Sequence, residues 1–277
     1  MILSFHPLFE ADLQITCAGR EPDDNDLAAI LKADGVLLPQ GAKEPLYRMA
    51  RENCRHVFPN YDARFAYPDK AGQIRLFKET GAAHPRTLCY DGLIDFHKKT
   101  AEKPLETLFD YPFVFKFNWG GEGDFVFAVK NKAELENILK KAEYYEKTGQ
   151  TGFQIQEYIS FPKTLRVVLI GETLKSYWRM PMDGFYANMK KGALIEAGGA
   201  PELVDKAVFE TNLFSKKTGI NLAGFDFLFR EERNGEEPTP LFLEINYFFG
   251  RSGLGGSIAY YALLEKEIMK WMATVCS

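Results

Sequence analysis

Three oxygen-bearing side chains towards the C-terminus have the types and spacing needed to bind a hard cation. Glu244 and Asn246 lie two residues apart in one apolar strand pattern, so they share a face of the predicted strand. Asp226 interrupts a second apolar pattern and joins them if the two strands pair. An oxygen-only cluster with open positions suits Mg²⁺ bound to a nucleotide, so metal–nucleotide chemistry is our first hypothesis. The alternative is that Asp226 is a buried, hydrogen-bonded acid beside an arginine, which we rank below metal ligation.

A lysine followed by a glycine-rich turn is a second candidate for anion binding. Lys116 lies near the end of an apolar strand pattern, and the turn after it contains Gly120, Gly121 and Gly123. Glycines let backbone N–H groups approach phosphate oxygens, and the lysine adds a positive charge for the same anion. A plain hairpin with an incidental lysine explains this segment equally well.

Other charged residues have a plain interpretation when each is taken alone. Lys70 follows Asp69 at the start of an amphipathic helix, which indicates an N-cap and a surface lysine. Arg166 and Arg179 interrupt apolar strands, where a structural salt bridge is the default and a bound anion the alternative. Glu157 lies in a strand pattern whose end could present a carboxylate and backbone amides to an adenine amino group.

Composition describes an ordinary chain and excludes several classes of protein. The 277 residues are 46% hydrophobic and 26% charged, and the net charge of −4 argues against a nucleic-acid binder that works through bulk charge. No apolar stretch reaches the ~18 residues of a membrane-spanning helix, and residues 1–7 read as a strand rather than a signal peptide. The four cysteines are scattered without metal spacing, which favours reduced thiols and a cytoplasmic location.

Strand and helix patterns alternate in the first ~65 residues and predict a small α/β domain there. Strands are expected at 1–5, 35–38, 56–58, 85–90, 113–117, 125–129, 153–159, 165–170, 174–180, 223–229 and 241–246. Helices are expected near 24–32, 43–53, 69–81, 132–147, 201–218 and 258–272. The chain is therefore expected to have an α/β (α+β) fold with two or three subdomains.

The order of these segments resembles the ATP-grasp superfamily. From residue 69 to residue 256 an Asp-Lys helix, a lysine strand with its glycine turn, a Gln-Glu-Tyr-Ile strand, a Leu-Arg strand and the two acid-bearing strands follow one another. The branch that this pattern is most similar to holds the ribosomal-protein glutamate ligases and glutathione synthetase. The resemblance implies two subdomains, 67–158 and 159–277, that clamp ATP, preceded by an N-terminal α/β domain at 1–66.

The resemblance also implies a role for each matching residue. The nucleotide-binding residues would be Lys70, Lys116, Gly120, Gly121, Gly123, Glu157, Tyr158, Ile159 and Arg166, with the lysines on the phosphates, the glycine loop as a lid, and residues 157–159 around the adenine. Asp226, Glu244 and Asn246 would ligate Mg²⁺, with Mn²⁺ as an alternative metal. Arg179 and Asn188 would lie near the transferred phosphate and the acyl intermediate, and Arg251 would bind the substrate carboxylate. The sequence departs from the family pattern at Phe125, where the loop usually has another glycine, at Thr164, where an acid commonly meets the ribose, and at Lys191, where this branch often has arginine.

The implied activity is an ATP-dependent ligation of a carboxylate to an amine through an acylphosphate, with release of ADP and phosphate. Its substrates would be a small-molecule or peptide carboxylate and an amine-bearing acceptor, without nucleic acid or membrane, and a homo-oligomer is compatible with the sequence. The alternative is an ATP-binding regulatory module without ligase turnover, which the retained Asp226, Glu244 and Asn246 argue against. A phosphotransferase of the same fold would need a phosphate-carrying histidine, and the four histidines are scattered.

Overall fold

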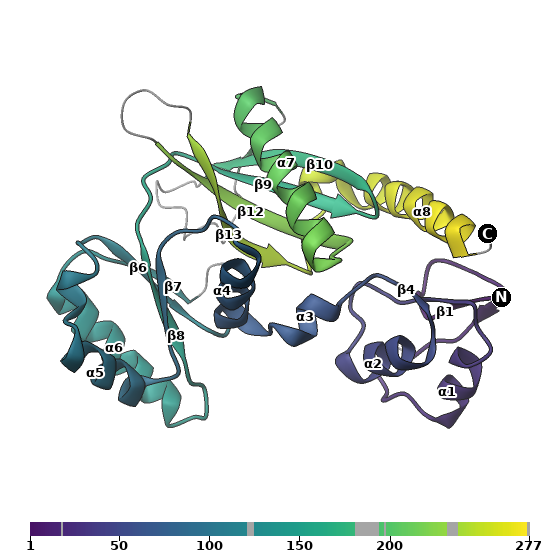
Figure 1. Ribbon diagram of the computed structural model, residues 1–277, viewed down its shortest axis with the longest axis horizontal. Coiled ribbons are helices and arrows are strands. Elements are labelled where there is room, and N and C mark those ends of the chain that lie inside the picture. Colours follow the sequence, from purple (N-terminus) through teal and green to yellow (C-terminus); the bar gives the residue numbers. More distant parts are fainter. Residues whose placement is uncertain (18, 121–124, 181–193, 197, 232–237, 276–277) are drawn as a thin grey trace.

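Three separate β-sheets follow one another along the chain (Figure 1). The computed structural model describes every residue except 18, 121–124, 181–193, 197, 232–237 and 276–277. Within the described residues the three sheets and their helices confirm the expected α/β fold.

The first sheet is a small parallel sheet with the strand order β2-β1-β3-β4. Its strands are β1 (Ile2–Ser4), β2 (Leu13–Gln14), β3 (Gly35–Leu37) and β4 (His56–Phe58), and its helices are α1 (Asp24–Ile30) and α2 (Glu44–Asn53). Helix α1 begins with a capping box, in which the side chain of Asp23 accepts from the backbone of Asp26 and the side chain of Asp26 accepts from the backbone of Asp23. These strands and helices form a small α/β unit at the N-terminal end of the chain.

The second sheet is antiparallel, with the order β5-β8-β6-β7, and is covered on one face by two helices. Its strands are β5 (Thr87–Tyr90), β6 (Phe113–Phe117), β7 (Val126–Val129) and β8 (Phe153–Glu157), and its helices are α5 (Leu93–Glu102) and α6 (Lys132–Glu146). Alternate residues of β6 and β8, including Phe115, Phe153 and Ile155, form a core with both helices. The other face of this sheet carries Lys116 and Val114.

The third sheet is antiparallel and has the order β11-β10-β9-β12-β13. Its strands are β9 (Thr164–Ile170), β10 (Thr173–Met180), β11 (Leu194–Glu196), β12 (Leu222–Arg230) and β13 (Thr239–Asn246). Helices α7 (Pro201–Thr218) and α4 (Asp69–Thr80) pack on one face, in a core that contains Phe77, Phe214 and Phe225. The α4 helix precedes the second sheet in the chain but contributes its apolar side to the core of the third.

The C-terminal helix α8 (Gly256–Val275) packs against both the third sheet and the first sheet. It packs Ile268 and Leu264 with Val168 of β9, and Trp271 lies against Phe58 of β4, with 5.7 Å between the ring centroids. Figure 1 shows both chain ends at this end of the molecule.

The structure corrects several expected boundaries. Helices α3 (Asp62–Ala66) and α5 were not predicted. The closing helix begins two residues earlier than expected, at Gly256. The short 3₁₀ turns at Leu105–Thr107 and Ser252–Leu254 complete the described elements.

A small apolar cluster joins the second and third sheets. Val114 of β6 lies in one cluster with Leu228 of β12, Leu241 of β13 and Ile159 of the linker between the sheets. The face of the second sheet that carries Lys116 is thus turned towards the third sheet, opposite to α5 and α6. This arrangement positions the candidate site.

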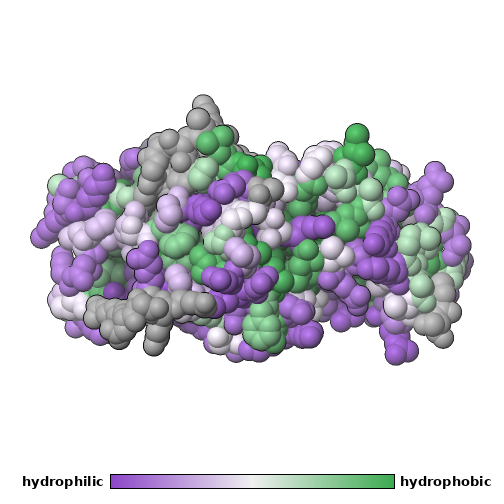
Figure 2. Space-filling model, turned by 90° about the horizontal axis from the view of Figure 1, so that it is seen from above, coloured by the Kyte–Doolittle hydropathy of each residue, from purple (hydrophilic) through white to green (hydrophobic). Residues whose placement is uncertain are grey.

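The surface mixes polar and apolar residues. Figure 2 shows hydrophilic and hydrophobic residues interspersed over the face seen from above. In the described part of the chain, no helix combines the length and the apolar character needed to cross a membrane.

Candidate active site

The two acid-bearing strands pair as the sequence predicted. Strands β12 and β13 are antiparallel neighbours, and Asp226 lies directly opposite Glu244. The register between β12 and β13 shifts after Asp226, and an irregularity of this kind bends the strands next to Asp226 and Glu244. The Nδ2 atom of Asn246 donates a hydrogen bond to Oδ2 of Asp226 at 3.2 Å. The three proposed metal ligands are therefore brought together on one face of the third sheet.

The charge of Asp226 is balanced by two arginines, one on the adjacent strand β9 and one on β10 beyond it. Arg166 donates from Nε and a terminal nitrogen to the two carboxylate oxygens, at 2.6 and 2.7 Å. Arg179 contributes a longer contact at 3.2 Å. Burial acts to raise the pKa of Asp226, but the charges of Arg166 and Arg179 outweigh it and hold the pKa below its ordinary value. The default interpretation of both arginines as salt-bridge partners is confirmed, and the structure gives Asp226 the environment that we had ranked second.

Lys116 and Lys70 supply positive charge opposite these acids. Lys116 is only 6% exposed, and burial lowers its pKa to about 8, against the opposing influence of Glu244. Burial also lowers the pKa of Lys70, and Glu244 again opposes the shift. The electrostatic influence of Glu244 on both lysines indicates that the second and third sheets share one charged site.

Lys70 is not the surface lysine expected from its sequence position. Its Nζ atom donates to the carbonyl oxygen of Gly120 at 2.7 Å, at the start of the glycine turn. Gly120 has φ +82°, and an added Cβ would lie 2.2 Å from the ring of Phe125, so only glycine fits there. Asp69 does cap helix α4, because its Oδ1 accepts from the backbone N–H groups of residues 71 and 72. The expected cap is confirmed and the expected surface lysine is wrong.

The residues proposed to hold adenine lie where the second sheet meets the third. Ile159 is buried, and Tyr158 packs against the apolar cluster that joins the sheets. The Glu157 carboxylate accepts hydrogen bonds from the backbone N–H of Arg86 and from the side chain of Arg230, so it already has two donors. Gln156 is 1% exposed, and its Oε1 atom has no hydrogen-bond partner within the described residues. A buried acceptor of this kind is normally satisfied, so a donor from water or from a ligand is expected here.

Arg251 lies apart from the acid–arginine cluster, at the start of the turn before α8. Its guanidinium carbon lies 4.5 Å from the ring centroid of Tyr261 and 4.8 Å from that of Tyr260. The residue borders a pocket of about 550 Å³ whose wall also includes Ser252, Ser257 and Phe248. Gly121, Gly123, Asn188 and Lys191 lie outside the described residues.

Two of the three proposed metal ligands have oxygens free to bind a cation. Glu244 forms no ion pair within the described part of the chain, and Asn246 uses its Nδ2 atom on Asp226, which leaves Oδ1 as an acceptor. Both oxygens of Asp226 accept from Arg166. No group of three or more histidine, cysteine, aspartate or glutamate side chains is arranged as a metal cluster in the described ranges. Glu244 and Asn246 thus fit one divalent cation that takes its other ligands from water or phosphate.

Two features of this site have no clear signal in the sequence. The Oε1 atom of Gln156 has no hydrogen-bond partner among the described residues because of which face of β8 is turned towards the third sheet. The hydrogen bond from Lys70 to Gly120 joins two residues that are 50 positions apart in the sequence. Both require the packing of two separate sheets, which local patterns do not determine.

Solved structures that resemble this chain identify its fold. The chain has the ATP-grasp fold. A D-alanine–D-alanine ligase from Bacillus anthracis has a TM-score of 0.60 at 17% identity, with 95% of this chain and 85% of that chain covered. An ATP-grasp RimK domain protein from Sphaerobacter thermophilus has a TM-score of 0.55 at 15% identity, with 86% and 82% covered. N5-carboxyaminoimidazole synthetase from Staphylococcus aureus, complexed with ADP, has a TM-score of 0.60 at 15% identity, with 91% and 65% covered, so this chain spans just under two thirds of that synthetase.

The family follows from the sequence itself. Residues 69–263 match the family described as the RimK-like ATP-grasp domain. This match covers well over half of the chain, and the protein belongs to the RimK-like ATP-grasp family. No curated protein matches the chain. The expected superfamily and branch are confirmed.

Proposed function

We propose that the protein is an ATP-dependent carboxylate–amine ligase that releases ADP and phosphate. The observation that carries the proposal is that Lys70 contacts the glycine turn after β6, Lys116 lies on the face of β6 turned towards the third sheet, and Glu244 lies opposite Asp226 in that sheet, in a RimK-like ATP-grasp chain. Two lysines that form no ion pair among the described residues suit a triphosphate, and a carboxylate near them suits the metal that accompanies it. Structural neighbours that are ligases of amino acids support the same class of reaction.

The proposed nucleotide lies between the second and third sheets. The adenine would lie against the apolar cluster of Val114, Ile159 and Leu241, with its amino group towards the Oε1 atom of Gln156. The phosphates would lie between Lys70 and Lys116, and Glu244 and Asn246 would hold Mg²⁺. When bound, the metal supplies charge neutralisation for the phosphate oxygens.

The arginines and acids then act by positioning and by charge. The substrate carboxylate attacks the γ-phosphorus, the bond to the bridging oxygen of ADP breaks, and an acylphosphate forms. An amine attacks the acyl carbon and phosphate leaves, which gives the amide. Arg179, half-buried beside Asp226, would stabilise the negative charge on the transferred group. Asp226 contacts Arg166, Arg179 and the Nδ2 atom of Asn246, which would leave the oxygen of Asn246 to hold the metal.

An ADP-release screen tests this function. Purified protein with Mg-ATP would be offered amino acids and short peptides in pairs, and ADP would be measured with and without each partner. The proposal predicts ADP formation that requires one carboxylate and one amine, with one amide formed for each ADP. Binding of Mg-ATP without ADP release from any pair would instead support a regulatory module, and absence of Mg-ATP binding would contradict both functions.

The buried Lys116 predicts that nucleotide affinity falls as pH rises. The pKa of Lys116 in the free protein is about 8, and a bound triphosphate raises it, so above this pH binding must be accompanied by proton uptake. Between the two pKa values the affinity should fall by up to about tenfold for each pH unit. Calorimetry of ATP binding at pH 7, 8 and 9 measures this slope.

Two variants show whether Lys116 is the source of the pH dependence. Lys116→Met should bind ATP weakly and with a flatter pH dependence. The control Lys130→Met changes an exposed lysine beyond the end of β7 and should behave like the wild type. Equal wild-type affinity at pH 7 and pH 9 would remove Lys116 from the phosphate site.

A further inference from the structure

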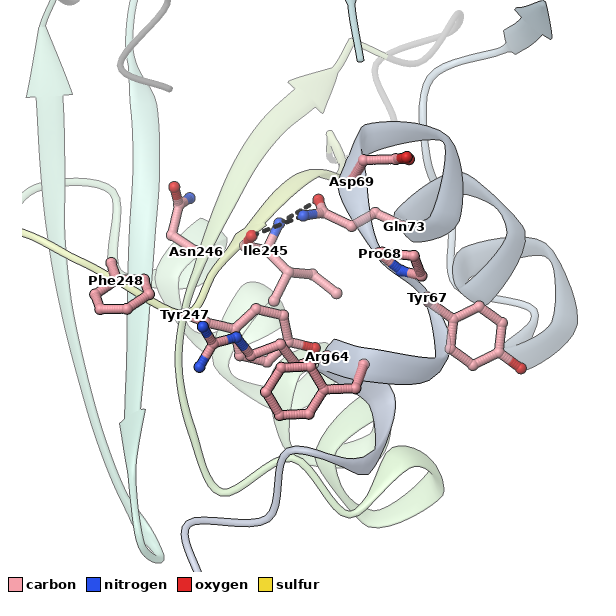
Figure 3. Close-up of a pocket in the computed structure, with 10 residues that line it drawn as sticks. Arg64, Tyr67, Pro68, Asp69, Gln73, Ile245, Asn246, Tyr247 and Phe248 are labelled. Carbon is pink, nitrogen blue, oxygen red and sulfur yellow. Dashed lines mark hydrogen bonds between the residues drawn. The ribbon is translucent and has the colours of Figure 1, made fainter. Parts of the chain in front are cut away.

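A pocket next to the proposed active site has four aromatic side chains among the ten residues that line it. It has a volume of about 400 Å³ and lies between the segment 64–73 and the end of β13 (Figure 3). Its walls include Phe65, Tyr67, Tyr247 and Phe248, and Arg64 is the basic residue among those that line it. The pocket also borders Asn246 and Asp69, which connects it to the metal strand and to the lysine helix.

The Arg64 guanidinium is surrounded by rings and has no acidic partner in the part of the chain that the structure describes. Its central carbon lies 4.9 Å from the ring centroids of Tyr61 and Phe65 and 5.0 Å from that of Phe248. Its hydrogen bonds are long ones, at 3.4 and 3.3 Å, to the carbonyl oxygens of Gln40 and Ala42. No carboxylate among the described residues lies within ion-pairing distance, although burial disfavours the charge and lowers the pKa. A guanidinium has five donors, so most of its capacity is unused.

Other arginines of this chain show what a structural role looks like. Several of them pair with carboxylates, in the pairs Arg20–Asp26, Arg48–Glu44, Arg51–Asp62, Arg166–Asp226 and Arg230–Glu157. Arg64 is more enclosed than the exposed members of this set but lacks such a partner. An anion from a ligand would satisfy it.

The walls of the pocket are held in place before any ligand binds. Gln73 accepts from the backbone N–H of Ile245 at 2.8 Å and donates to its carbonyl oxygen at 2.9 Å (Figure 3). Asp69 has φ +58°, a left-handed conformation that is rare for a residue with a side chain. Strain of this kind is concentrated at ligand sites, where the surrounding structure maintains it. The pocket is therefore a preformed cavity beside the metal strand.

We propose that this pocket is a substrate subsite, in which Arg64 binds a carboxylate carried by an apolar, aromatic-sized body such as that of an apolar amino acid. The subsite rests on the proposed function, because it places one substrate of the ligase beside Asn246. The rings provide the apolar contact, and the guanidinium provides two parallel donors to the carboxylate.

Binding of two probes to the full-length protein tests the subsite without ATP or turnover. Calorimetry would compare 3-phenylpropionate with 3-phenylpropionamide, which has the same body without the charge. The carboxylate should bind at least about tenfold more tightly than the amide. In Arg64→Met, which keeps the apolar stem on the rings, carboxylate binding should fall at least about tenfold while amide binding is unchanged.

Two further variants make the result specific. Arg64→Lys keeps the charge and should recover part of the carboxylate affinity, even if Arg64→Met proves unstable in a thermal melt. Arg86→Met removes another arginine stacked on a ring, 4.6 Å from the centroid of Phe109, and should change nothing. Equal binding of both probes, no binding of either probe by the wild type at millimolar concentration, or equal loss in Arg86→Met would overturn the subsite. Because no ADP is formed, a failed ADP-release screen with intact probe binding would refute the ligase alone.

Discussion

Glu244→Gln should reduce ADP formation by a factor of about 100 or more while leaving the fold intact. The substitution keeps the size of the side chain but removes its negative charge from the place where Lys70 and Lys116 converge. Glu244 forms no ion pair in the described part of the chain, so its loss should not expose a buried partner. The cost should therefore fall on metal binding and the reaction rather than on stability.

Steady-state ADP release and circular dichroism together measure this effect. Glu202→Gln serves as a control, because Glu202 is an exposed acid in the first turn of α7 and lies outside the proposed site. Asn246→Ala should resemble Glu244→Gln, since it removes the second metal oxygen. A folded Glu244→Gln protein with wild-type ADP release would show that this carboxylate does not hold the metal.

Arg166→Met is expected to cause the largest loss of stability, about 3–5 kcal/mol. The side chains of Arg166 and Asp226 are 9% and 8% exposed, and the pair is bidentate. Removing the arginine leaves the carboxylate buried, with the longer contacts to Arg179 and Asn246. Equilibrium unfolding in urea at pH 7 measures the difference.

A second substitution and a matched ion pair test the reason for this loss. Arg166→Met combined with Asp226→Asn should recover much of the stability, because it also removes the unpaired buried charge. Arg230→Met breaks a more exposed pair with Glu157, whose side chains are 41% and 22% exposed, and should cost less than about 1 kcal/mol. A loss in Arg166→Met no larger than the loss in Arg230→Met would mean that the buried pair contributes little to the fold.

The alternation of side chains along strands explains how much of the site the sequence could predict. Because Glu244 and Asn246 are two residues apart, their shared face follows from strand geometry alone. The pairing with Asp226 follows from two neighbouring apolar strands and is confirmed by the register. Helix α7 was also predicted with its correct bounds, because Pro201 at its start and Gly219 just after its end are strong local signals.

Contacts between distant segments limited the remaining predictions. Nothing local distinguishes an arginine that pairs with Asp226 from one that binds phosphate, so both interpretations of Arg166 were open until the order of β9 and β12 was known. The pocket at Arg64 is built from residues 64–73 and from residues 245–248, which are more than 170 positions apart. Its aromatic residues carry no spacing signal in either segment.

The most direct test of the proposed nucleotide site is a crystal structure with Mn²⁺ and a non-hydrolysable ATP analogue. Anomalous scattering would locate the metal independently of the nucleotide. We predict a metal bound by Glu244 and by Oδ1 of Asn246, with the phosphates between Lys70 and Lys116. The adenine should lie against the apolar cluster between the second and third sheets. A nucleotide bound elsewhere, or a metal that touches neither Glu244 nor Asn246, would contradict the site and the ligase function built on it.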